Sequence, residues 1–410
     1  MGQMEARELT GACTIVSPNY LPFARTLALS YRAHHPVDEF FVLIVGRIAD
    51  KSAFAEEPYT AVFLEEIGLQ NVQSLGMKYN ILELNTNVKP RFMLYLLAQR
   101  NISMLVYLDP DIYVYLRLQP VFDLLCHHNA VLTPHLTTPS SEPDGGFEQD
   151  VLSNGTYNLG FFAVRRNEET TQLLEWWDRR CVEKGFSEGR SGLFVDQKWM
   201  NLAPSLFDGV VQCKHPGCNM GVWNLDERKL SVCNGRYVVN GQSPLYFFHF
   251  SGVAVDRPEV LFRFTHRHTP SSRPDLQQIF AEYKEAVSRN RVPSLDEIPY
   301  GFDRFDDGTA ITLIARRIYA AHEKSFSHED PFQSNSDFYR FAQRHGLTAG
   351  KVQQPKIGWE GLEAQGRRVT VVHLILKFTL KLLGPNRYEL LMKYLGFISI
   401  LRNQAVFIKD

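Results

Sequence analysis

The sequence predicts an α/β protein with a Rossmann-like mixed sheet flanked by helices, followed by a mainly helical C-terminal region. Short apolar runs such as 11–16 and 40–45 fit buried strands, and stretches with helical periodicity separate them. Alternating strands and helices predict parallel strands joined by crossover helices. A change of composition at residues 266–274, which are rich in His, Arg, Pro and Ser, indicates where this organisation ends. We therefore expect two domains, residues 1–265 and residues 266–410.

Local signals predict the elements of the first domain. A proline in the first turn supports a helix over 90–100, and Asn167 is placed to cap a helix that runs to Lys184. Strands are expected over residues 11–16, 40–45, 62–64, 104–109, 130–134, 157–164 and 245–250. Ligands of such sheets bind at the carboxyl ends of the strands, so polar residues at those ends are the first candidates for a site.

The second domain is expected to be helical. Asp275 is placed to cap a helix with one apolar face, and further helical stretches are expected near 309–323 and 336–345. The last stretch, 367–402, carries seven Lys or Arg residues against one acidic residue, among many apolar ones. Two interpretations stay open for it: packing of a helical domain on the catalytic part, or peripheral attachment to an anionic membrane face.

The bulk composition is that of an ordinary globular protein. Of the 410 residues, 44% are hydrophobic and 22% are charged, and the formal net charge of −1 argues against nucleic acid as a partner. The six cysteines are scattered, which favours reduced thiols over a disulfide framework. The charged N-terminus lacks an apolar signal segment, and no apolar run has the length of a membrane span. These features predict a cytoplasmic protein, with the inner membrane face as a peripheral location.

The most informative segment is the apolar and aromatic run 105–115, which contains Asp109 and Asp111. The run predicts a buried strand that delivers both carboxylates to one edge of the sheet. Burying ionised carboxylates is costly unless a cation meets them. Two carboxylates one residue apart can bind one divalent cation, and Mg²⁺ or Mn²⁺ at such a site usually also holds phosphates of a substrate. The alternative is an acidic turn after a core strand.

Further polar segments follow this strand at expected strand ends or helix starts. They are Asn158-Leu159-Gly160, Asp196-Gln197 with Asn201, Asn219 to Asn224, and His249-Phe250-Ser251-Gly252. The acid of the second segment could instead be a helix cap, and the third could be a loop around a buried Trp. No G-x-G-x-x-G and no Walker A motif follows the first strand, which disfavours dinucleotide-binding and P-loop functions.

In this order, and with the strand Tyr107-Leu108-Asp109-Pro110-Asp111, the segments resemble retaining glycosyltransferases of the GT-A fold. The resemblance is to family 8 in particular, the glycogenin and bacterial lipooligosaccharide galactosyltransferase group, and it covers residues 11–265. It implies transfer of a hexose from a nucleoside-diphosphate sugar, a UDP-sugar in this family, to a saccharide or glycolipid acceptor with retention of configuration. It also implies Mn²⁺ or Mg²⁺ as the cofactor.

The resemblance assigns a role to each matching residue. The metal ligands are expected to be Asp109, Asp111 and His249. The donor sugar is expected to lie against Asn158, Asp196 and Gln197. The nucleotide and its phosphates are expected to contact Ser17, Asn19, Tyr20, Lys89, Arg91, Gly160, Gly252 and Arg257. Tyr20 is a stacking face for the base, whereas Lys89 and Arg91 could equally be structural cations at a helix start.

One departure from the family pattern concerns the segment after Gly252. The family has Lys-Pro-Trp there, whereas this chain has Arg257-Pro258 two residues further on and lacks the Trp. Arg257 could replace the phosphate contact with its fork of donors. Because of this divergence, the family's particular sugars and acceptors are not carried over.

Two other functions stay open at the level of sequence. One is a metal-dependent nucleotide-sugar phosphohydrolase or nucleotidyltransferase that uses the same Asp pair, although the Gly- and Lys/Arg-rich signature of a nucleotidyltransferase is missing. The other is a non-catalytic sugar-binding protein on the same scaffold, against which the intact Asp109, Asp111 and His249 argue. Bacterial polysaccharide or glycolipid biosynthesis is the expected context.

Overall fold

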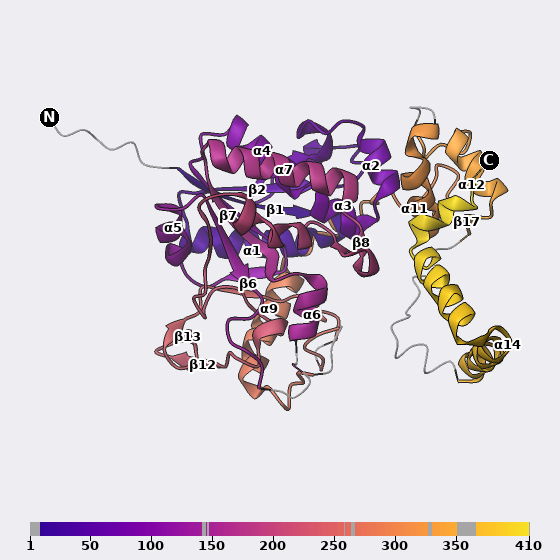
Figure 1. Cartoon of the computed structure of the whole chain (residues 1–410). Coiled ribbons are helices and arrows are strands. Elements are labelled where there is room, and N and C mark those ends of the chain that lie inside the picture. The colour runs from indigo at the N-terminus through magenta and orange to yellow at the C-terminus, as the bar shows by residue number, and fades with distance from the viewer. Residues whose placement is uncertain are drawn as a thin grey trace. The chain divides into compact units, whose positions relative to one another are not determined.

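The computed structural model (Figure 1) describes residues 9–141, 145, 147–257, 259–263, 267–326, 330–350 and 366–409. Contacts within the chain divide it into two compact units. The first unit consists of residues 1–72 and 81–301, and the second of residues 73–80 and 302–410.

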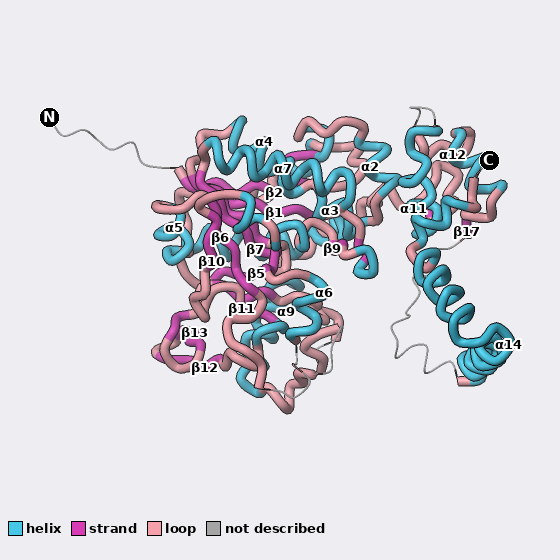
Figure 2. Tube along the Cα trace, in the orientation of Figure 1, coloured by secondary structure: helices cyan, strands magenta, loops and turns pink. Residues whose placement is uncertain are grey.

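The centre of the first unit is a seven-stranded sheet with the strand order β10-β6-β7-β4-β1-β2-β3. Figure 2 shows strands in magenta between cyan helices. β7 runs antiparallel to β4 and β6, whereas the other neighbouring strands are parallel. The mixed sheet is therefore confirmed, and every strand predicted between 11–16 and 157–164 has a counterpart in it. The strands are β1 (Thr10–Val16), β2 (Glu39–Ile44), β3 (Thr60–Phe63), β4 (Met104–Leu108), β6 (Ala130–Pro134), β7 (Tyr157–Arg165) and β10 (Val210–Gln212).

The strand predicted over 245–250 is shorter and lies in a different sheet. It is β15 (Phe247–His249), which pairs with β5 (Ile112–Val114) and β11 (Met220–Gly221). Because β5 begins directly after the Asp pair, this small sheet brings His249 to the end of β4. The remaining strands of the first unit are β8 (Ser187–Glu188), β9 (Leu193–Phe194), β12 (Leu230–Cys233), β13 (Arg236–Val239) and β14 (Ser243–Pro244).

Helices cover both faces of the large sheet. Val106 faces an apolar core that it shares with α1 and α5, whereas Phe162 on the other face packs edge-on against Trp177 of α7, with ring centroids 5.3 Å apart. As predicted, Asn167 caps α7, and its side chain accepts a hydrogen bond from the Thr170 N–H at 2.8 Å. The helices of the first unit are α1 (Leu21–His34), α3 (Ile81–Asn87), α4 (Lys89–Gln99), α5 (Gln119–Leu125), α6 (Glu148–Asn154), α7 (Glu168–Lys184), α8 (Ala203–Leu206), α9 (Gln277–Arg289) and α10 (Pro293–Asp296).

The division between the units falls after residue 301, later than the predicted boundary at residue 265. The reason is α9, whose apolar face is buried in one cluster with Phe248 and Phe250. Phe250 stacks on Tyr283 of α9 with ring centroids 3.8 Å apart. Since Phe248 and Phe250 flank His249, α9 supports the strand that carries this histidine.

The cap predicted for α9 is wrong. Asp275 lies inside a short 3-10 turn, Pro274–Leu276, that precedes the helix. Its carboxylate accepts hydrogen bonds from the Arg273 guanidinium at 2.8 Å and from the Leu230 N–H at 3.0 Å. Because these partners bind both oxygens of the carboxylate, Asp275 does not cap the helix N-terminus.

The second unit is mainly helical, as predicted. Buried Arg316 explains why residues 73–80 belong to it, because its guanidinium donates to the carbonyls of Gly76 at 2.6 Å and Tyr79 at 2.8 Å. The helix predicted near 309–323 begins only after Thr312, since the residues before it form β16. The elements are most of α2 (Val72–Lys78), α11 (Leu313–His322), α12 (Asp337–Arg344), α14 (Arg367–Ile398), β16 (Ala310–Ile311) and β17 (Thr348–Ala349).

Among the described helices, none combines the length and the apolar character needed to cross a membrane.

Candidate functional site

Three metal-ligating side chains meet at the carboxyl end of β4. Asp109 follows β4 directly, Asp111 precedes β5, and His249 ends β15. One ligand atom from each lies within 4.8 Å of the other two. His249 Nε2 is 2.9 Å from Asp111 Oδ1 and 3.8 Å from Asp109 Oδ2. The structure thus brings together all three residues that the sequence nominated, and we call them the Asp-Asp-His cluster.

The backbone fixes this cluster from two sides. The Asp109 N–H donates to the Gly160 carbonyl of β7 at 2.7 Å, and the Phe250 N–H donates to the Asp111 carbonyl at 2.8 Å. Gly160 also provides the space, because a Cβ there would lie 2.3 Å from His249 Cε1 and 2.8 Å from Asp109 Oδ2. Gly160, which was expected to contact the nucleotide and its phosphates, thus makes room for the cluster itself.

His249 is buried and held by an amide. Its Nδ1 lies 3.2 Å from Asn158 Oδ1, which also accepts a hydrogen bond from Asn219 Nδ2 at 3.0 Å. With its proton on Nδ1, the imidazole presents the Nε2 lone pair to the two carboxylates, as metal-binding histidines do. Trp223 packs edge-on against the ring, with centroids 5.1 Å apart. The Asn158 side chain is thus seen to orient His249, a role that sequence reasoning did not assign to it.

The electrostatics of the cluster favour a cation. Burial lowers the pKa of His249, but Asp111 and then Asp109 raise it, so that the balance lies above its usual value. Without another positive charge, the imidazole itself is therefore drawn toward the protonated form. Two carboxylates and one imidazole are a donor set that suits Mg²⁺ or Mn²⁺. The residues present consequently fit the metal that the sequence implied.

A second ionic pair is buried next to this cluster. Lys89 Nζ, at the start of α4, lies 2.7 Å from Asp196 Oδ2, and both side chains are only 2% exposed. The same ammonium donates to the Leu159 carbonyl at 2.6 Å and lies over the Tyr107 ring at 4.2 Å. Burial raises the pKa of Asp196, Lys89 lowers it, and Asp109 raises it. The pair is therefore within electrostatic range of the Asp-Asp-His cluster.

Tyr107 connects the two groups. Its hydroxyl donates a hydrogen bond to Asp109 Oδ1 at 2.7 Å, while its ring carries the Lys89 ammonium. Gln197, next to Asp196, accepts from the Leu159 N–H at 3.1 Å and donates to the Asn154 carbonyl at 3.1 Å. Gln197 is thus engaged with the backbone on both sides, so its amide already ties β7 to the end of α6.

The loop after β1 lies within electrostatic range of the same cluster. Ser17 is buried and donates to Asn19 Oδ1 at 2.9 Å, whereas Tyr20 is 43% exposed and stacks on Phe23 at 4.9 Å. Burial raises the pKa of Tyr20, and Asp111 raises it further. The predicted nucleotide loop and the predicted metal ligands therefore share one region, although they are separated by about 90 residues in sequence.

Of two further predicted phosphate cations, Arg91 is engaged elsewhere, whereas Arg257 contributes only a backbone contact. Arg91 forms an ion pair with the buried carboxylate of Asp178 and so ties α4 to α7. Arg257 is exposed, and its carbonyl accepts a hydrogen bond from Lys284 Nζ at 2.8 Å. These contacts favour the structural alternative for Arg91.

A cation that the sequence did not indicate lies within electrostatic range of the loop. Arg263 lowers the pKa of Tyr20 through its charge, and its backbone N–H donates to the carbonyl of Gly252 at 2.8 Å. Its guanidinium forms an exposed ion pair with Asp256. Gly252 has a positive φ of 70°, which suits glycine. No spacing rule marks Arg263, because it reaches the site only through the turn that follows Gly252.

Comparisons with known proteins add two relatives and a fold likeness. No protein-family model matches the chain. The uncharacterized protein YfnF of Bacillus subtilis (strain 168) is 29% identical over 224 residues, which cover 54% of this chain and 72% of YfnF. The uncharacterized protein YfnD of the same strain is 23% identical over 304 residues, covering 72% of this chain and 93% of YfnD. A solved structure of the galactosyltransferase LgtC with donor and acceptor sugar analogues is 18% identical, covers 70% of this chain and 97% of LgtC, and has a TM-score of 0.42.

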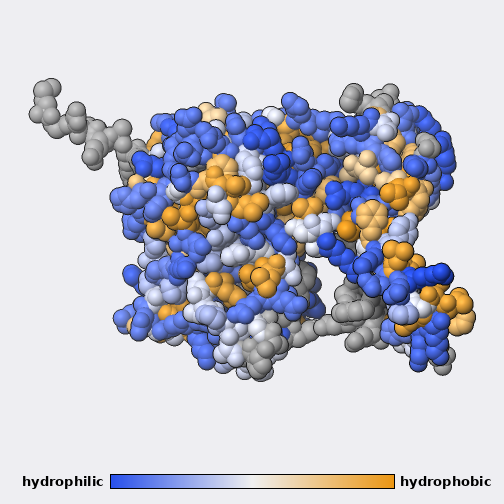
Figure 3. Space-filling model, viewed as in Figure 1, coloured by the Kyte–Doolittle hydropathy of each residue, from blue (hydrophilic) through white to orange (hydrophobic). Residues whose placement is uncertain are grey.

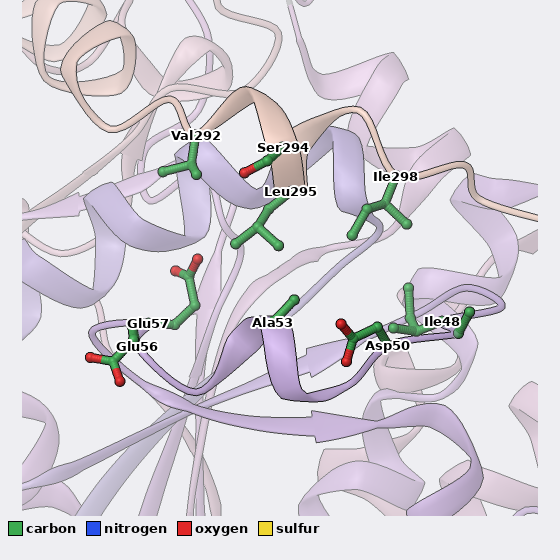
Figure 4. Close-up of a pocket in the computed structure, with 10 residues that line it drawn as sticks. Ile48, Asp50, Ala53, Glu56, Glu57, Val292, Ser294, Leu295 and Ile298 are labelled. Atoms are coloured by element: carbon green, nitrogen blue, oxygen red, sulfur yellow. The ribbon is translucent and has the colours of Figure 1, made fainter.

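A cavity of about 580 Å³ lies in another part of the first unit (Figure 4). The loop around Asp50 and Glu56 forms one wall, and α10 with Leu295 forms the other. Arg25 joins the two walls, because it pairs with Glu57 at 2.8 Å and with Asp296 at 2.7 Å. None of the predicted site residues lines this cavity, so we assign it no part in the candidate site.

Proposed function

We propose that the chain is a metal-dependent glycosyltransferase. It transfers a hexose from a nucleoside-diphosphate sugar, a UDP-sugar in the first instance, to a hydroxyl of a saccharide or glycolipid acceptor with retention of configuration. The observation that carries this proposal is the Asp-Asp-His cluster, set beside a buried carboxylate and beside an exposed tyrosine on the loop after β1. The Asp-Asp-His cluster fits a metal and a diphosphate. The buried carboxylate fits a sugar, and the exposed tyrosine fits a nucleobase.

The metal would be held by Asp109, Asp111 and His249, and when bound it supplies Lewis-acid stabilisation of the departing diphosphate. Asn158 keeps His249 in the ligating orientation through its 3.2 Å contact with Nδ1. Tyr107 holds Asp109 by its hydroxyl, so one carboxylate oxygen is fixed while the other faces the cluster.

The donor sugar is assigned to the Lys89–Asp196 pair and its neighbours. Asp196 is buried but kept near a cation, so a fixed negative charge faces the region where positive charge develops on the anomeric carbon. Gln197 and Asn158 supply amides beside it. In this scheme the residues position and stabilise, and Asp196 does not need to form a covalent bond with the sugar.

The nucleoside is assigned to the loop of Ser17, Asn19 and Tyr20. The Tyr20 ring is 43% exposed, so it can stack on a base while Phe23 supports its other side. Arg263 is within electrostatic range of Tyr20, and its backbone N–H binds the Gly252 carbonyl, so these two residues are the proposed contacts of the phosphates.

Donor binding and hydrolysis test the proposal. Purified protein is mixed with Mn²⁺ and a panel of UDP-, GDP-, TDP- and CMP-sugars, and thermal stabilisation and release of nucleotide are measured. We expect one donor to stabilise the protein and to be hydrolysed slowly, in both cases only with metal. If no nucleotide gives a response with any metal, the transferase proposal fails and a sugar-binding role becomes the better explanation.

Two arginines compete for the phosphate role, and a matched pair of variants separates them. Arg263→Gln is expected to weaken donor binding about 10- to 100-fold, because it removes a charge-assisted hydrogen bond to a phosphate. Arg257→Gln removes the same charge six residues away and is expected to change donor affinity less than about twofold. Donor affinities from calorimetry decide the matter, and equal losses in the two variants would contradict the assignment to Arg263.

A further inference from the structure

The helix α14 has no buried residue among its described side chains. Large apolar side chains on it are instead exposed, from 40% for Leu380 to 71% for Leu382. Surfaces of this kind on folded proteins mark sites of attachment to a partner or a membrane. Figure 3 shows orange apolar atoms beside blue ones over this segment. The exposed members on α14 and the turn that follows it are Val371, Val372, Leu374, Ile375, Phe378, Leu380, Leu382, Leu390, Tyr394, Leu395, Phe397, Val406 and Phe407.

A kink divides α14 into two shorter helices. Gly384 has φ 72° and ψ 167°, and Pro385 follows it, so the regular helix stops and starts again. The first part ends at residue 383 and the second runs from residue 385 to residue 398. Each part therefore presents its own apolar surface.

Between residues 369 and 383, the polar residues other than Thr379 form one narrow stripe. Thr370, His373, Lys377 and Lys381 follow one another at spacings of three or four residues, which places them on one side of the helix. Thr379, on the opposite side, donates its hydroxyl to the Ile375 carbonyl at 2.8 Å and so does not add a polar group there. Over residues 369–383 the remaining circumference is apolar apart from Thr379, a distribution typical of helices that lie in a membrane interface.

The charges of this segment have one sign. Between residues 369 and 409 the sequence has six Lys or Arg residues and one acidic residue, Glu389, which pairs with Lys393 at 2.6 Å. Two copies of such a segment would repel each other, whereas an anionic surface would attract it. The positive charge therefore favours an anionic surface, rather than a second copy of the segment, as the partner that covers the apolar residues.

The segment is attached to the folded part of the second unit. The 3-10 turn η9 (Leu401–Val406) follows α14 and packs against α11. Just beyond it, the Ile408 carbonyl lies 3.0 Å from His322 Nε2 at the end of α11. The kinked helix and η9 thus form one chain segment, and the C-terminal end of this segment is fixed on α11.

We propose that α14 is an interfacial anchor that lies on an anionic bilayer, with its apolar residues in the headgroup region and its cations toward the phosphates. The long Lys and Arg side chains suit this position, because their apolar stems follow the helix while their charges reach the interface. The proposal concerns the second unit only and does not depend on the activity of the first.

Flotation of the full-length protein with vesicles tests this anchor. The protein is expected to float with vesicles of phosphatidylcholine and phosphatidylglycerol, to bind pure phosphatidylcholine much more weakly, and to dissociate as salt is raised. Neutralising Lys377, Lys381, Arg387 and Lys393 to Gln is expected to weaken binding about fivefold for each cation removed. A matched variant, with Arg179, Lys184, Lys214 and Arg289 changed to Gln, removes the same charge from the first unit and is expected to bind as the wild type does.

The apolar contribution is tested separately. Ile375, Phe378 and Leu382 lie on one side of the helix, and changing all three to Ser is expected to abolish flotation even with every cation present. Because these side chains are 58%, 66% and 71% exposed, the change should leave thermal unfolding unaltered. Failure of the wild type to float with anionic vesicles overturns the proposal, as does a stable dimer in lipid-free solution that the triple Ser variant converts to monomer.

Discussion

Replacing Asp111 by alanine is expected to abolish metal binding and to lower donor turnover by at least about 10²–10³-fold. The carboxylate lies 2.9 Å from His249 Nε2, whereas Asp109 lies 3.8 Å from the same atom. Without Asp111, the cluster keeps two ligand groups and loses half of its negative charge. Calorimetric titration with Mn²⁺ measures the first effect, and release of nucleotide from the donor measures the second.

The control for this change is Asp123→Ala on α5. Asp123 is an exposed carboxylate that accepts a hydrogen bond from Gln119 at 2.7 Å, and its removal should affect neither Mn²⁺ binding nor turnover. The Asp111 variant should also unfold near the temperature of the metal-free wild type, since its side chain is partly exposed. An Asp111→Ala protein that still binds Mn²⁺ and releases nucleotide at the wild-type rate would remove the cluster from the mechanism.

The parts of the site that the sequence predicts well depend on short-range signals. Asp109 and Asp111 are evident because an apolar run of adjacent residues delivers them to the end of a strand. Gly160 is also evident from the local sequence, because a glycine inside a strand indicates that another group approaches the backbone closely. The order of the motifs along the chain then identified His249 as a third metal ligand. Its contact with Asp111 spans 138 residues.

The supporting residues could not be predicted, because each depends on a long-range contact. Asn219 reaches Asn158 across 61 residues, and Lys89 reaches Asp196 across 107. Nothing in the local sequence says that Lys89 points inward whereas Arg91, two residues on, pairs with Asp178 on α7. The same limitation applies to the fold, because residues 73–80 join the second unit through long-range contacts. Arg316 binds two of their carbonyls, and the Tyr319 hydroxyl donates to Ser74 Oγ at 3.1 Å.

Replacing Lys89 by methionine is expected to destabilise the protein by about 3–5 kcal/mol. The change keeps most of the side-chain volume but leaves the Asp196 carboxylate buried without its cation, and it also frees the Leu159 carbonyl. Chemical unfolding measures the loss. Lys51→Met is the control, because Lys51 is 41% exposed and pairs with exposed acids, a contact worth about 1 kcal/mol or less.

The pH dependence of this loss identifies its cause. Burial already raises the pKa of Asp196 above its usual value, and removal of Lys89 should raise it further. A carboxyl whose pKa is raised by folding favours the folded state below its unfolded pKa, and this contribution is lost as pH rises through the folded pKa. The gap in stability between Lys89→Met and the wild type should therefore narrow as pH falls and Asp196 takes up a proton. A gap that is constant with pH would instead indicate lost packing.

A double variant separates the structural role of the pair from its proposed chemical role. Lys89→Met combined with Asp196→Leu removes both charges, and buried ion pairs replaced by apolar residues of similar size commonly cost little stability or none. The double variant should therefore unfold within about 1–2 kcal/mol of the wild type while donor turnover stays lost. Restored folding with restored turnover would show that the pair serves the fold alone, whereas restored folding without turnover places the Lys89–Asp196 pair in the chemistry.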